Sequence, residues 1–567
     1  MMKTTFVAIN AMYQHRSLAL QLLHNAVQSL DILHCPLELT INMRSEALFR
    51  AVYETKPDVL CFSCYIWNIH LVLQIIKDIK KVLPLVKIVL GGPEVSYDAV
   101  FYLDTYPQID AILCGEGEQS YPKLLAQYAN GGDGTGIAGV LLQGMQRVQQ
   151  PALAPEVSLS QTMDAYLSLS HYDPARIWYA ETSRGCPFHC QFCLSSVTPG
   201  VRALSAADAL VILGAMAQRG AKLVKLVDRT FNFDTKRALA IWQGLLAIPS
   251  DCVFHFEIEP SLLDEETLLF LQSVPPGRFQ FEIGIQSTNP QTLQHISRRF
   301  QEEKVQKSVR RLRSYGNIPL HLDLIAGLPA EDFTSFANSF DTVWGFMPNV
   351  LQLGFLKLLR GSGLRERAAA YGIVYQEEAP YEVLQTAVLS QDELLLLKDI
   401  DKTVDWYCNS FAYPASMALL LQGAASPFAC FQALALSLRH AGYFSASIGQ
   451  AERLCALYEA GCAFLPYEKH ALLADAIRFD AYMQDVRQEK LPPACRDIAF
   501  MDTERSYLRK HYASYDERRA YRLARFMLAV DTLITQKQIV SEETILLIHR
   551  TSKQYWRVTL AGNTAEE

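Results

Sequence analysis

The chain has 567 residues, which is room for roughly three or four domains, each with its own core. Half of the residues are hydrophobic, and 52 basic against 59 acidic side chains give a formal charge of -7. This balance excludes a chain that is basic throughout, as many nucleic-acid binders are.

The first residues, Met1 to Asn10, form a short apolar run that we interpret as a strand. The run lacks the longer apolar stretch and the small-residue cleavage site of a signal peptide. The chain also has 13 cysteines, an odd number, which fits a reducing compartment better than a disulfide framework. We therefore expect a cytoplasmic protein.

Residues 1 to 145 alternate strand and helix patterns. Strands are expected up to Asn10, near Leu39, and over residues 58–63, 87–90 and 111–114, and helices over residues 18–30, 46–54 and up to Val82. This βαβ order predicts a Rossmann-like domain, a parallel sheet with helices on both faces.

Ligands of such sheets bind at the carboxyl ends of the strands. The candidate cofactor-binding residues at these ends are Asn10, His15, Ser63, Tyr65, Trp67, Gly91, Gly92, Pro93, Gly115 and Glu116. Glycines at two successive strand ends indicate either a close approach of the backbone to a ligand or simply tight turns.

Three of these segments carry a resemblance, namely CFSCYIWN (61–68), VLGGPEVS (89–96) and ILCGEGEQSYPKLL (112–125). Together they resemble a cobalamin-binding domain, and the resemblance implies cobalamin as a ligand. Such domains often ligate cobalt with a D-x-H-x-x-G motif, which the loop Asn10–Ser17 does not contain. We therefore expect five-coordinate cobalt or a lower face without histidine, with His15 as the alternative ligand.

Residues 146–172 form the expected linker, marked by Pro151 and Pro155. Residues 173–375 repeat strand and helix patterns. Strands are expected over residues 178–182, 223–227, 253–258, 279–285, 320–325 and 350–355. Six parallel strands with crossover helices predict a partial (β/α)6 barrel, which places its chemistry at the strand C-termini.

The loop after the first of these strands contains Cys186, Cys190 and Cys193, spaced C-x3-C-x2-C, with Phe192 just before the last cysteine. Three thiolates are one too few for a [4Fe-4S] cluster, so one iron would stay open to a chelating small molecule. The spacing resembles the signature of radical S-adenosylmethionine (SAM) enzymes, which implies that SAM binds this iron and that Phe192 lies close to the cofactor.

Two other interpretations of the three cysteines stay open. Together with His189 or His171 they have the ligand set of a Cys3His zinc site. Their proximity could also be a coincidence in a chain with 13 cysteines.

Polar residues follow the later barrel strands, and these strand ends resemble the SAM-binding strand ends of cobalamin-dependent radical SAM enzymes. The candidate cofactor-binding residues are Asp228, Glu257, Gln286, Ser287, Asp323 and Gly327. The resemblance implies that Gln286, Ser287 and Asp323 contact the nucleoside or methionine part of SAM, and that backbone near Gly327 meets the adenine. The alternative is that a strand-end polar residue only caps the next helix.

Residues 376–567 are expected to be mainly helical, most clearly over residues 384–404 and 469–487. This part, together with the loop NAMYQHRSLAL (10–20), resembles a poorly characterised subfamily with a helical C-terminal domain. Residues 407–438 contain no charged side chain, but Pro414, Gly423 and Pro427 interrupt them. We therefore expect buried helices here and no membrane span.

Between Arg505 and Arg525, arginines alternate with tyrosines, a mixture suited to phosphate contacts and base stacking. Glu504, Asp516 and Glu517 are mixed into the same stretch. A solvated helix face is therefore the favoured interpretation, and RNA is the less favoured one.

The resemblance as a whole implies a cobalamin-dependent radical SAM methyltransferase with a [4Fe-4S] cluster, SAM and cobalamin as cofactors. A 5′-deoxyadenosyl radical would activate an unactivated carbon of a small-molecule or peptide substrate, and methylcobalamin would supply the methyl group. Its partner would be a one-electron reductant such as flavodoxin or ferredoxin. The alternatives are ring formation or rearrangement without methyl transfer, or a cobalamin-sensing or RNA-binding protein with a structural cluster.

Overall fold

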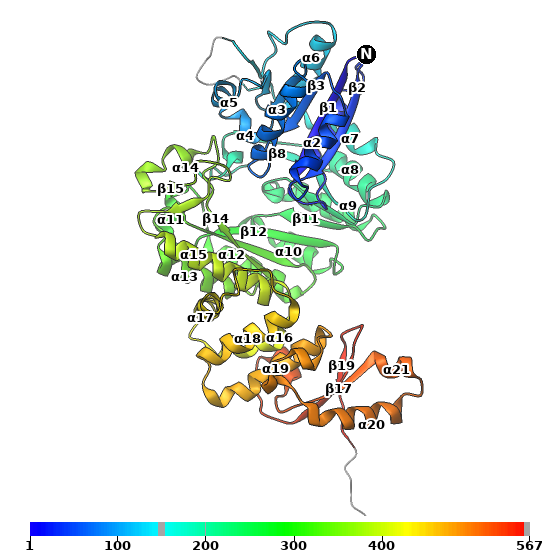
Figure 1. Cartoon of the computed structure of the whole chain (residues 1–567), viewed down its shortest axis with the longest axis vertical. Helices are drawn as coiled ribbons and strands as arrows, with labels where there is room; N and C mark the ends of the chain where they lie inside the picture. The colour runs from blue at the N-terminus through cyan, green and yellow to red at the C-terminus, as the bar shows by residue number, and fades with distance from the viewer. Residues whose placement is uncertain (146–152, 199, 561–567) are drawn as a thin grey trace, which may run out of the picture. The chain divides into compact units, whose positions relative to one another are not determined.

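The computed structural model describes residues 1–145, 153–198 and 200–560 (Figure 1). Pro151 and most of the linker's first residues lie outside them. The chain forms two compact units, Met1–Phe336 with Phe346–Pro348 and Gly354–Ser390, and Ala337–Gly345 with Asn349–Leu353 and Gln391–Glu567. The boundaries expected for three domains, 1–145, 173–375 and 376–567, stay predictions.

The first unit begins with a six-stranded sheet of order β2-β1-β3-β4-β5-β6, drawn blue to cyan in Figure 1. The strands are β1 Lys3–Asn10, β2 Leu33–Thr40, β3 Val59–Ser63, β4 Lys87–Gly91, β5 Ala111–Leu113 and β6 Val140–Leu142. The helices are α1 Leu18–Ala26, α2 Ser45–Glu54, α3 Ile69–Val82, α4 Pro93–Ser96, α5 Ala99–Thr105 and α6 Gly117–Ala129. The pairs from β2 to β5 are parallel, as expected, and β6 adds an antiparallel edge strand.

Burial explains this arrangement. Every residue of β3 is buried, because helices cover both faces of the sheet. The helix α3 buries Ile69, Val72, Ile76 and Ile79, a stripe at the spacing of one helix face. The carboxyl ends of β1, β3, β4 and β5 consequently share one edge of the sheet.

The second sheet, green in Figure 1, has the order β14-β13-β12-β11-β10-β7. Its strands are β7 Ile177–Ala180, β10 Leu223–Leu226, β11 Val253–Glu257, β12 Phe279–Gln286, β13 Leu320–Ala326 and β14 Val350–Phe355. The helices between them are α8 Ala206–Gln218, α9 Thr235–Leu246, α10 Glu265–Gln272, α11 Pro290–His295, α12 Glu302–Tyr315 and α13 Phe333–Trp344. The pairs from β7 to β13 are parallel, so the predicted α/β class and the six barrel strands are confirmed.

Side chains in β12 and β13 alternate between the two faces of the sheet. Buried and half-buried residues follow one another along both strands. The apolar set packs under the helices, while Glu282, Gln286 and Asp323 point to the other face, into the barrel.

Short elements complete the first unit: α7 Asp164–Leu167, β8 Ser183–Gly185 paired with β9 Val201–Ala203, α14 Gly363–Glu366, and β15 Val374–Tyr375 paired with β16 Val383–Gln385. The hairpin β8–β9 brackets the cysteine loop.

The C-terminal part is helical, as expected, and also contains a small sheet that the sequence pattern did not predict. The helices are α15 Gln391–Val404, α16 Pro414–Gly423, α17 Pro427–His440, α18 Gln450–Phe464, α19 His470–Met483, α20 Met501–His511, α21 Tyr515–Ala520 and α22 Val530–Gln536. The antiparallel strands are β17 Tyr521–Phe526, β18 Thr544–His549 and β19 Tyr555–Arg557.

The uncharged stretch forms α16 and α17, most of whose side chains are at least half-buried. Within the described residues, no single helix is both long and apolar enough to cross a bilayer. The pair α16 and α17 passes such a test only in combination, and its two helices are bent by 108° at their break.

Candidate functional site

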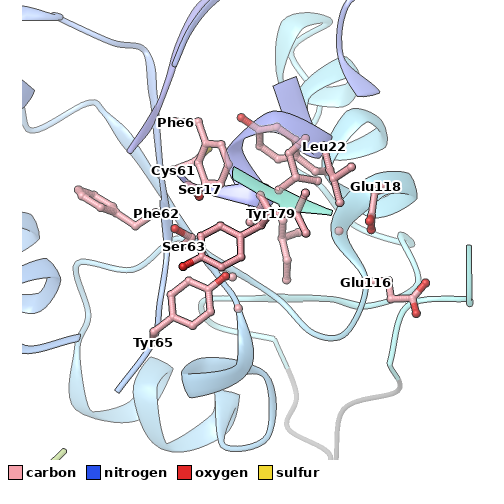
Figure 2. A pocket seen from close by; sticks show the side chains of 18 of the residues that line it. Phe6, Ser17, Leu22, Cys61, Phe62, Ser63, Tyr65, Glu116, Glu118 and Tyr179 are labelled. Atoms are coloured by element: carbon pink, nitrogen blue, oxygen red, sulfur yellow. The ribbon is translucent and has the colours of Figure 1, made fainter. Parts of the chain in front are cut away.

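A cavity of about 630 Å³ lies at the carboxyl ends of the first sheet. The predicted residues that line it are Asn10, His15, Ser63, Tyr65, Trp67, Gly91, Gly92, Gly115 and Glu116. Its other side comes from the barrel, through Tyr179, Glu181, Arg184, Val227 and Arg229. We call this space the interdomain cavity, and Figure 2 shows Ser63, Tyr65 and Tyr179 around it.

An aromatic pair forms part of its wall. The rings of Tyr65 and Trp67 stack with centroids 4.3 Å apart and planes within 6°. Trp67 is anchored by its indole N–H, which donates to the Ile9 carbonyl at 3.2 Å, and the Asn68 amide holds the turn by accepting from Tyr65 N at 2.8 Å. The flat face is thus built into the strand end.

Only glycine fits the backbone at position 92. Its φ is +104°, and an added Cβ would lie 2.6 Å from the Cys64 carbonyl oxygen. A side chain at this position would push the backbone of one strand end against that of the next.

An ion-pair cluster joins the two walls of the interdomain cavity. Arg184, next to the cysteine loop, contacts Glu116 at 3.0 Å and Glu181 at 2.8 Å, and it also pairs with Glu118. Burial alone would raise the pKa of Glu116, but the hydrogen bond from Arg202 and the charge of Arg184 together lower it. The cluster therefore ties the first sheet's loops to the barrel.

His15 lies in this cavity but is already engaged. Its Nδ1 is 2.7 Å from the Tyr179 hydroxyl, and burial, with a smaller contribution from the charge of Lys225, lowers its pKa. The imidazole is therefore held neutral, which is the form that binds metals.

A second cavity, of about 250 Å³, contains all three cysteines of the motif. We call it the cysteine cavity. Besides Cys186, Cys190 and Cys193 it is lined by Phe192, Arg229, Thr230, Glu257, Glu259, Glu282, Gly284, Gln286, Arg298 and Asp323, among others.

Polar groups stand next to two of the sulfur atoms. The Cys186 Sγ is 3.5 Å from the Thr230 hydroxyl, and Arg298 donates to the Cys190 Sγ at 3.6 Å. Arg298 also donates to the Gly284 carbonyl and lies 3.7 Å from Glu259. Hydrogen bonds to cluster sulfurs are one of the means by which proteins set cluster potentials.

The strand end at Gln286 is irregular. Gln286 has a φ of +74°, and the register between β12 and β13 shifts between Gly284 and Gln286. A Cβ on Gly284 would lie 2.0 Å from the Gln286 amide nitrogen, so the glycine makes room for this side chain. Such bulges re-aim side chains next to active sites.

Carboxyl groups dominate the cysteine cavity, with Glu257, Glu259, Glu282 and Asp323 against Arg229 and Arg298. The Oδ1 atom of Asp323 is buried and has no hydrogen-bond partner among the residues that the structure describes. Burial raises the pKa of Asp323 to about 8, with the charges of Glu282 and Glu257 adding to the effect, and burial raises the pKa of Glu257 to about 7.

These two shifts predict a pH effect on stability. Because both folded-state pKa values exceed the value of about 4 for unfolded carboxyl groups, their stabilising contribution is present at low pH and is lost as the pH rises through about 7 to 8. We expect the thermal midpoint of the SAM-free protein to fall from about pH 5 to about pH 8, and to fall less steeply in Asp323→Asn. Equal slopes in a fluorescence melt of both proteins would contradict this assignment.

Four predicted residues line neither cavity. Ser287 is buried and donates to the Glu331 carboxylate at 2.6 Å, and Gly327 packs against Val383. Pro93 opens α4, and Asp228 lies fully buried beneath the cysteine loop, accepting from Thr182 N at 3.0 Å.

Sequence reasoning missed several residues of the site. Arg184, Arg298 and Tyr179 line one or the other cavity, yet no strand-end or spacing pattern marked them. Arg298 lies in a loop beyond α11, and only the tertiary structure brings it to Cys190.

The residues present suit the expected groups. Three thiols line one cavity, each available to a different iron of a cluster. Within the described ranges, no three His, Cys, Asp or Glu side chains converge as on a single ion. His189 and His171, the candidate zinc ligands, are exposed and line neither cavity. The carboxyl-rich wall with its orphaned Asp323 oxygen suits the sulfonium and ammonium charges of SAM, and the Gly92 cradle suits a closely bound cobalamin.

Three segments of the chain match known protein families. Residues 4–125 match the B12 binding domain, residues 180–343 the radical SAM superfamily, and residues 369–547 a protein family of unknown function, DUF4080.

Individual proteins are similar at low identity. The cobalamin-dependent radical SAM methyltransferase TokK of Streptomyces tokunonensis is 26% identical over 318 residues, 51% of this chain and 45% of TokK. The chain spans about half the length of such curated relatives.

Two solved structures share the fold. The radical SAM enzyme OxsB, with aqua-cobalamin and SAM bound, aligns with a TM-score of 0.56 at 14% identity, covering 91% of this chain and 82% of OxsB. The methyltransferase TsrM from Kitasatospora setae, with cobalamin and a [4Fe-4S] cluster bound, aligns with a TM-score of 0.53 at 15% identity, covering 68% and 82%.

The fold, the cysteine loop and these matches define the class: the chain carries a B12-binding domain followed by a radical SAM domain. The B12-binding and radical SAM matches agree with the expected cobalamin, SAM and [4Fe-4S] cofactors, and the aligned OxsB and TsrM structures together contain these groups. Within this class, the chain is a protein whose C-terminal third matches DUF4080.

Proposed function

We propose that the chain is a cobalamin-dependent radical SAM enzyme that methylates an unactivated carbon of a small-molecule or peptide substrate. The observation that carries the proposal is that the interdomain cavity and the cysteine cavity share a lining residue, Arg229. When bound, SAM and the cluster supply a hydrogen-abstracting radical, and cobalamin supplies a methyl group.

In this proposal, Cys186, Cys190 and Cys193 hold the cluster and leave one iron for SAM. Gln286 and Asp323 bind polar groups of SAM, since both line the cysteine cavity and the Asp323 Oδ1 has no partner within the described part of the chain. Phe192 forms part of the same wall.

On the other side, the Tyr65–Trp67 pair and the glycines at positions 91, 92 and 115 hold the corrin, because they line the interdomain cavity. His15 would be a candidate cobalt ligand through its second ring nitrogen, since its Nδ1 already contacts Tyr179. The Arg184 ion pairs keep this wall in register with the cysteine loop.

Anaerobic reconstitution with iron, sulfide and cobalamin tests the proposal. The loaded protein is incubated with SAM carrying a deuterated methyl group, a metabolite and peptide extract, and a reductant such as flavodoxin or ferredoxin. We expect 5′-deoxyadenosine and a product that carries the labelled methyl group, both detected by mass spectrometry.

Other results would support the alternatives. Formation of 5′-deoxyadenosine with a changed but unlabelled product would indicate ring formation or rearrangement. Absence of 5′-deoxyadenosine from fully loaded protein would contradict the radical reaction and favour a sensor or an RNA-binding protein with a structural cluster.

A further inference from the structure

Arg229 lies at the border of the interdomain cavity and the cysteine cavity. It follows β10, with Val227 before it lining the interdomain cavity and Thr230 after it lining the cysteine cavity. Arg229 itself lines both. Its side chain is 54% exposed, so the guanidinium is accessible to a ligand.

The guanidinium is only loosely paired. Among the described residues its ion-pair contact is with Glu257, at 3.9 Å, close to the limit for such a pair. Burial raises the pKa of Glu257 to about 7 even though Arg229 opposes the shift. Arg298, the other guanidinium of the cysteine cavity, is by contrast engaged by Gly284, Glu259 and Cys190.

Arg229 brings a positive charge to the edge of a cavity that is lined mainly by carboxyl groups. These carboxyl groups suit a cationic ligand such as SAM, whereas a guanidinium suits an anionic one. A planar guanidinium offers paired N–H donors that match a carboxylate or a phosphate. Such a pair gains strength where water is partly excluded.

We propose that Arg229 binds an anionic group of the substrate, a carboxylate or a phosphate, close to the carbon that reacts. The inference rests on the proposed function, which requires a substrate to reach both the SAM-derived radical and the corrin-bound methyl group. A substrate that does so lies at the junction of the two cavities, within reach of Arg229.

The test uses the holoenzyme and an extract of small molecules and peptides separated into anionic, neutral and cationic fractions. Each fraction is added with SAM and a reductant, and the rate of 5′-deoxyadenosine formation is measured. We expect the anionic fraction alone to raise this rate. Phosphatase treatment of that fraction removes the effect if the anion is a phosphate and leaves it if the anion is a carboxylate.

Variants then locate the effect. In Arg229→Gln the amount of anionic fraction needed for half-maximal stimulation should rise about 10- to 100-fold, as expected for a lost charge-assisted hydrogen bond. Arg229→Lys should recover part of it. Arg50→Gln should match the wild type, because it removes an exposed arginine whose ion pair, within the described ranges, is with Glu46 of its own helix.

Three results would overturn the inference. The first is that the neutral or cationic fraction, or no fraction, stimulates the reaction, and the second is that Arg229→Gln and Arg50→Gln behave equally. The third is loss of bound cobalamin from Arg229→Gln, which would make Arg229 a corrin contact. If the wild type forms no 5′-deoxyadenosine at all, the proposed function fails, and thermal unfolding decides the inference. The anionic fraction should then still stabilise the wild type and not Arg229→Gln.

Discussion

Replacing Cys190 with alanine is expected to remove the cluster and, with it, 5′-deoxyadenosine formation. Cys190 is buried, 6% exposed, and its sulfur accepts a hydrogen bond from Arg298. Loss of even an outer partner of a metal ligand costs about 10- to 100-fold in affinity or activity, so loss of the ligand itself should reduce activity by at least about 100-fold. Iron and sulfide analysis, visible absorption and chromatography of the nucleoside measure the effect.

Cys35→Ala provides the matched control, because Cys35 lies on the edge strand β2 and is half-buried, away from both cavities. It should keep the iron content and activity of the wild type. A Cys190→Ala protein that retained the full cluster would contradict the assignment of the three cysteines as its ligands.

Replacing Asp228 with alanine is expected to destabilise the barrel more than any change at its surface. This carboxylate is fully buried and accepts from Thr182 N, the Thr182 hydroxyl at 2.8 Å and the Ser183 hydroxyl. Arg237 donates to the same Thr182 side chain at 2.9 Å. Removing the carboxylate leaves three buried donors, Thr182 N and the Thr182 and Ser183 hydroxyls, without their acceptor. An unsatisfied buried donor costs about 1 to 3 kcal/mol, so the expected loss is about 3 to 5 kcal/mol.

For a barrel of this size the loss corresponds to a fall of roughly 10 °C in the thermal midpoint, measured by circular dichroism on the cluster-free protein. Cluster incorporation should fall too, because Thr182 and Ser183 lead directly into the cysteine loop. Asp234→Ala is the control: it removes only an exposed helix cap, which accepts from Arg237 N at 3.0 Å and is worth about 1 kcal/mol. Equal midpoints for the two variants would contradict the role given to Asp228.

Asp228 also shows that a strand-end position can be anticipated from the sequence while the direction of its side chain cannot. The strand pattern predicted that Asp228, after β10, lies at the mouth of the barrel. The resemblance implied that it contacts a cofactor. In the structure the Asp228 side chain points inward and accepts hydrogen bonds from Thr182 and Ser183, which lead into the cysteine loop. The order of residues along the chain does not reveal that direction. Ser287 behaves likewise, donating to Glu331 at 2.6 Å rather than lining a cavity.

Regular alternation along β12 and β13 made other site residues predictable. Gln286 and Asp323 were expected at strand ends, and both line the cysteine cavity. The side-chain period of a strand is a local property, so it is visible without the fold. The C-terminal strands β17 and β19 were not anticipated, because arginines and tyrosines interrupt the apolar pattern there. The strand β18 has an uninterrupted apolar run, which the expectation of a mainly helical region left out.

The class of the protein could be predicted from its sequence through the resemblance of its motifs to a known family. The features that carry this resemblance are local: the spacing of Cys186, Cys190 and Cys193, the glycines at successive strand ends and the repeated βα order. Each can be recognised within a short stretch of the sequence. The tertiary structure alone decided which groups meet across long separations: Arg184 with Glu116, Arg298 with Cys190, and Arg229 with both cavities. Such contacts form between loops that are far apart in the sequence and that folding brings together, and no local pattern encodes which of these loops meet.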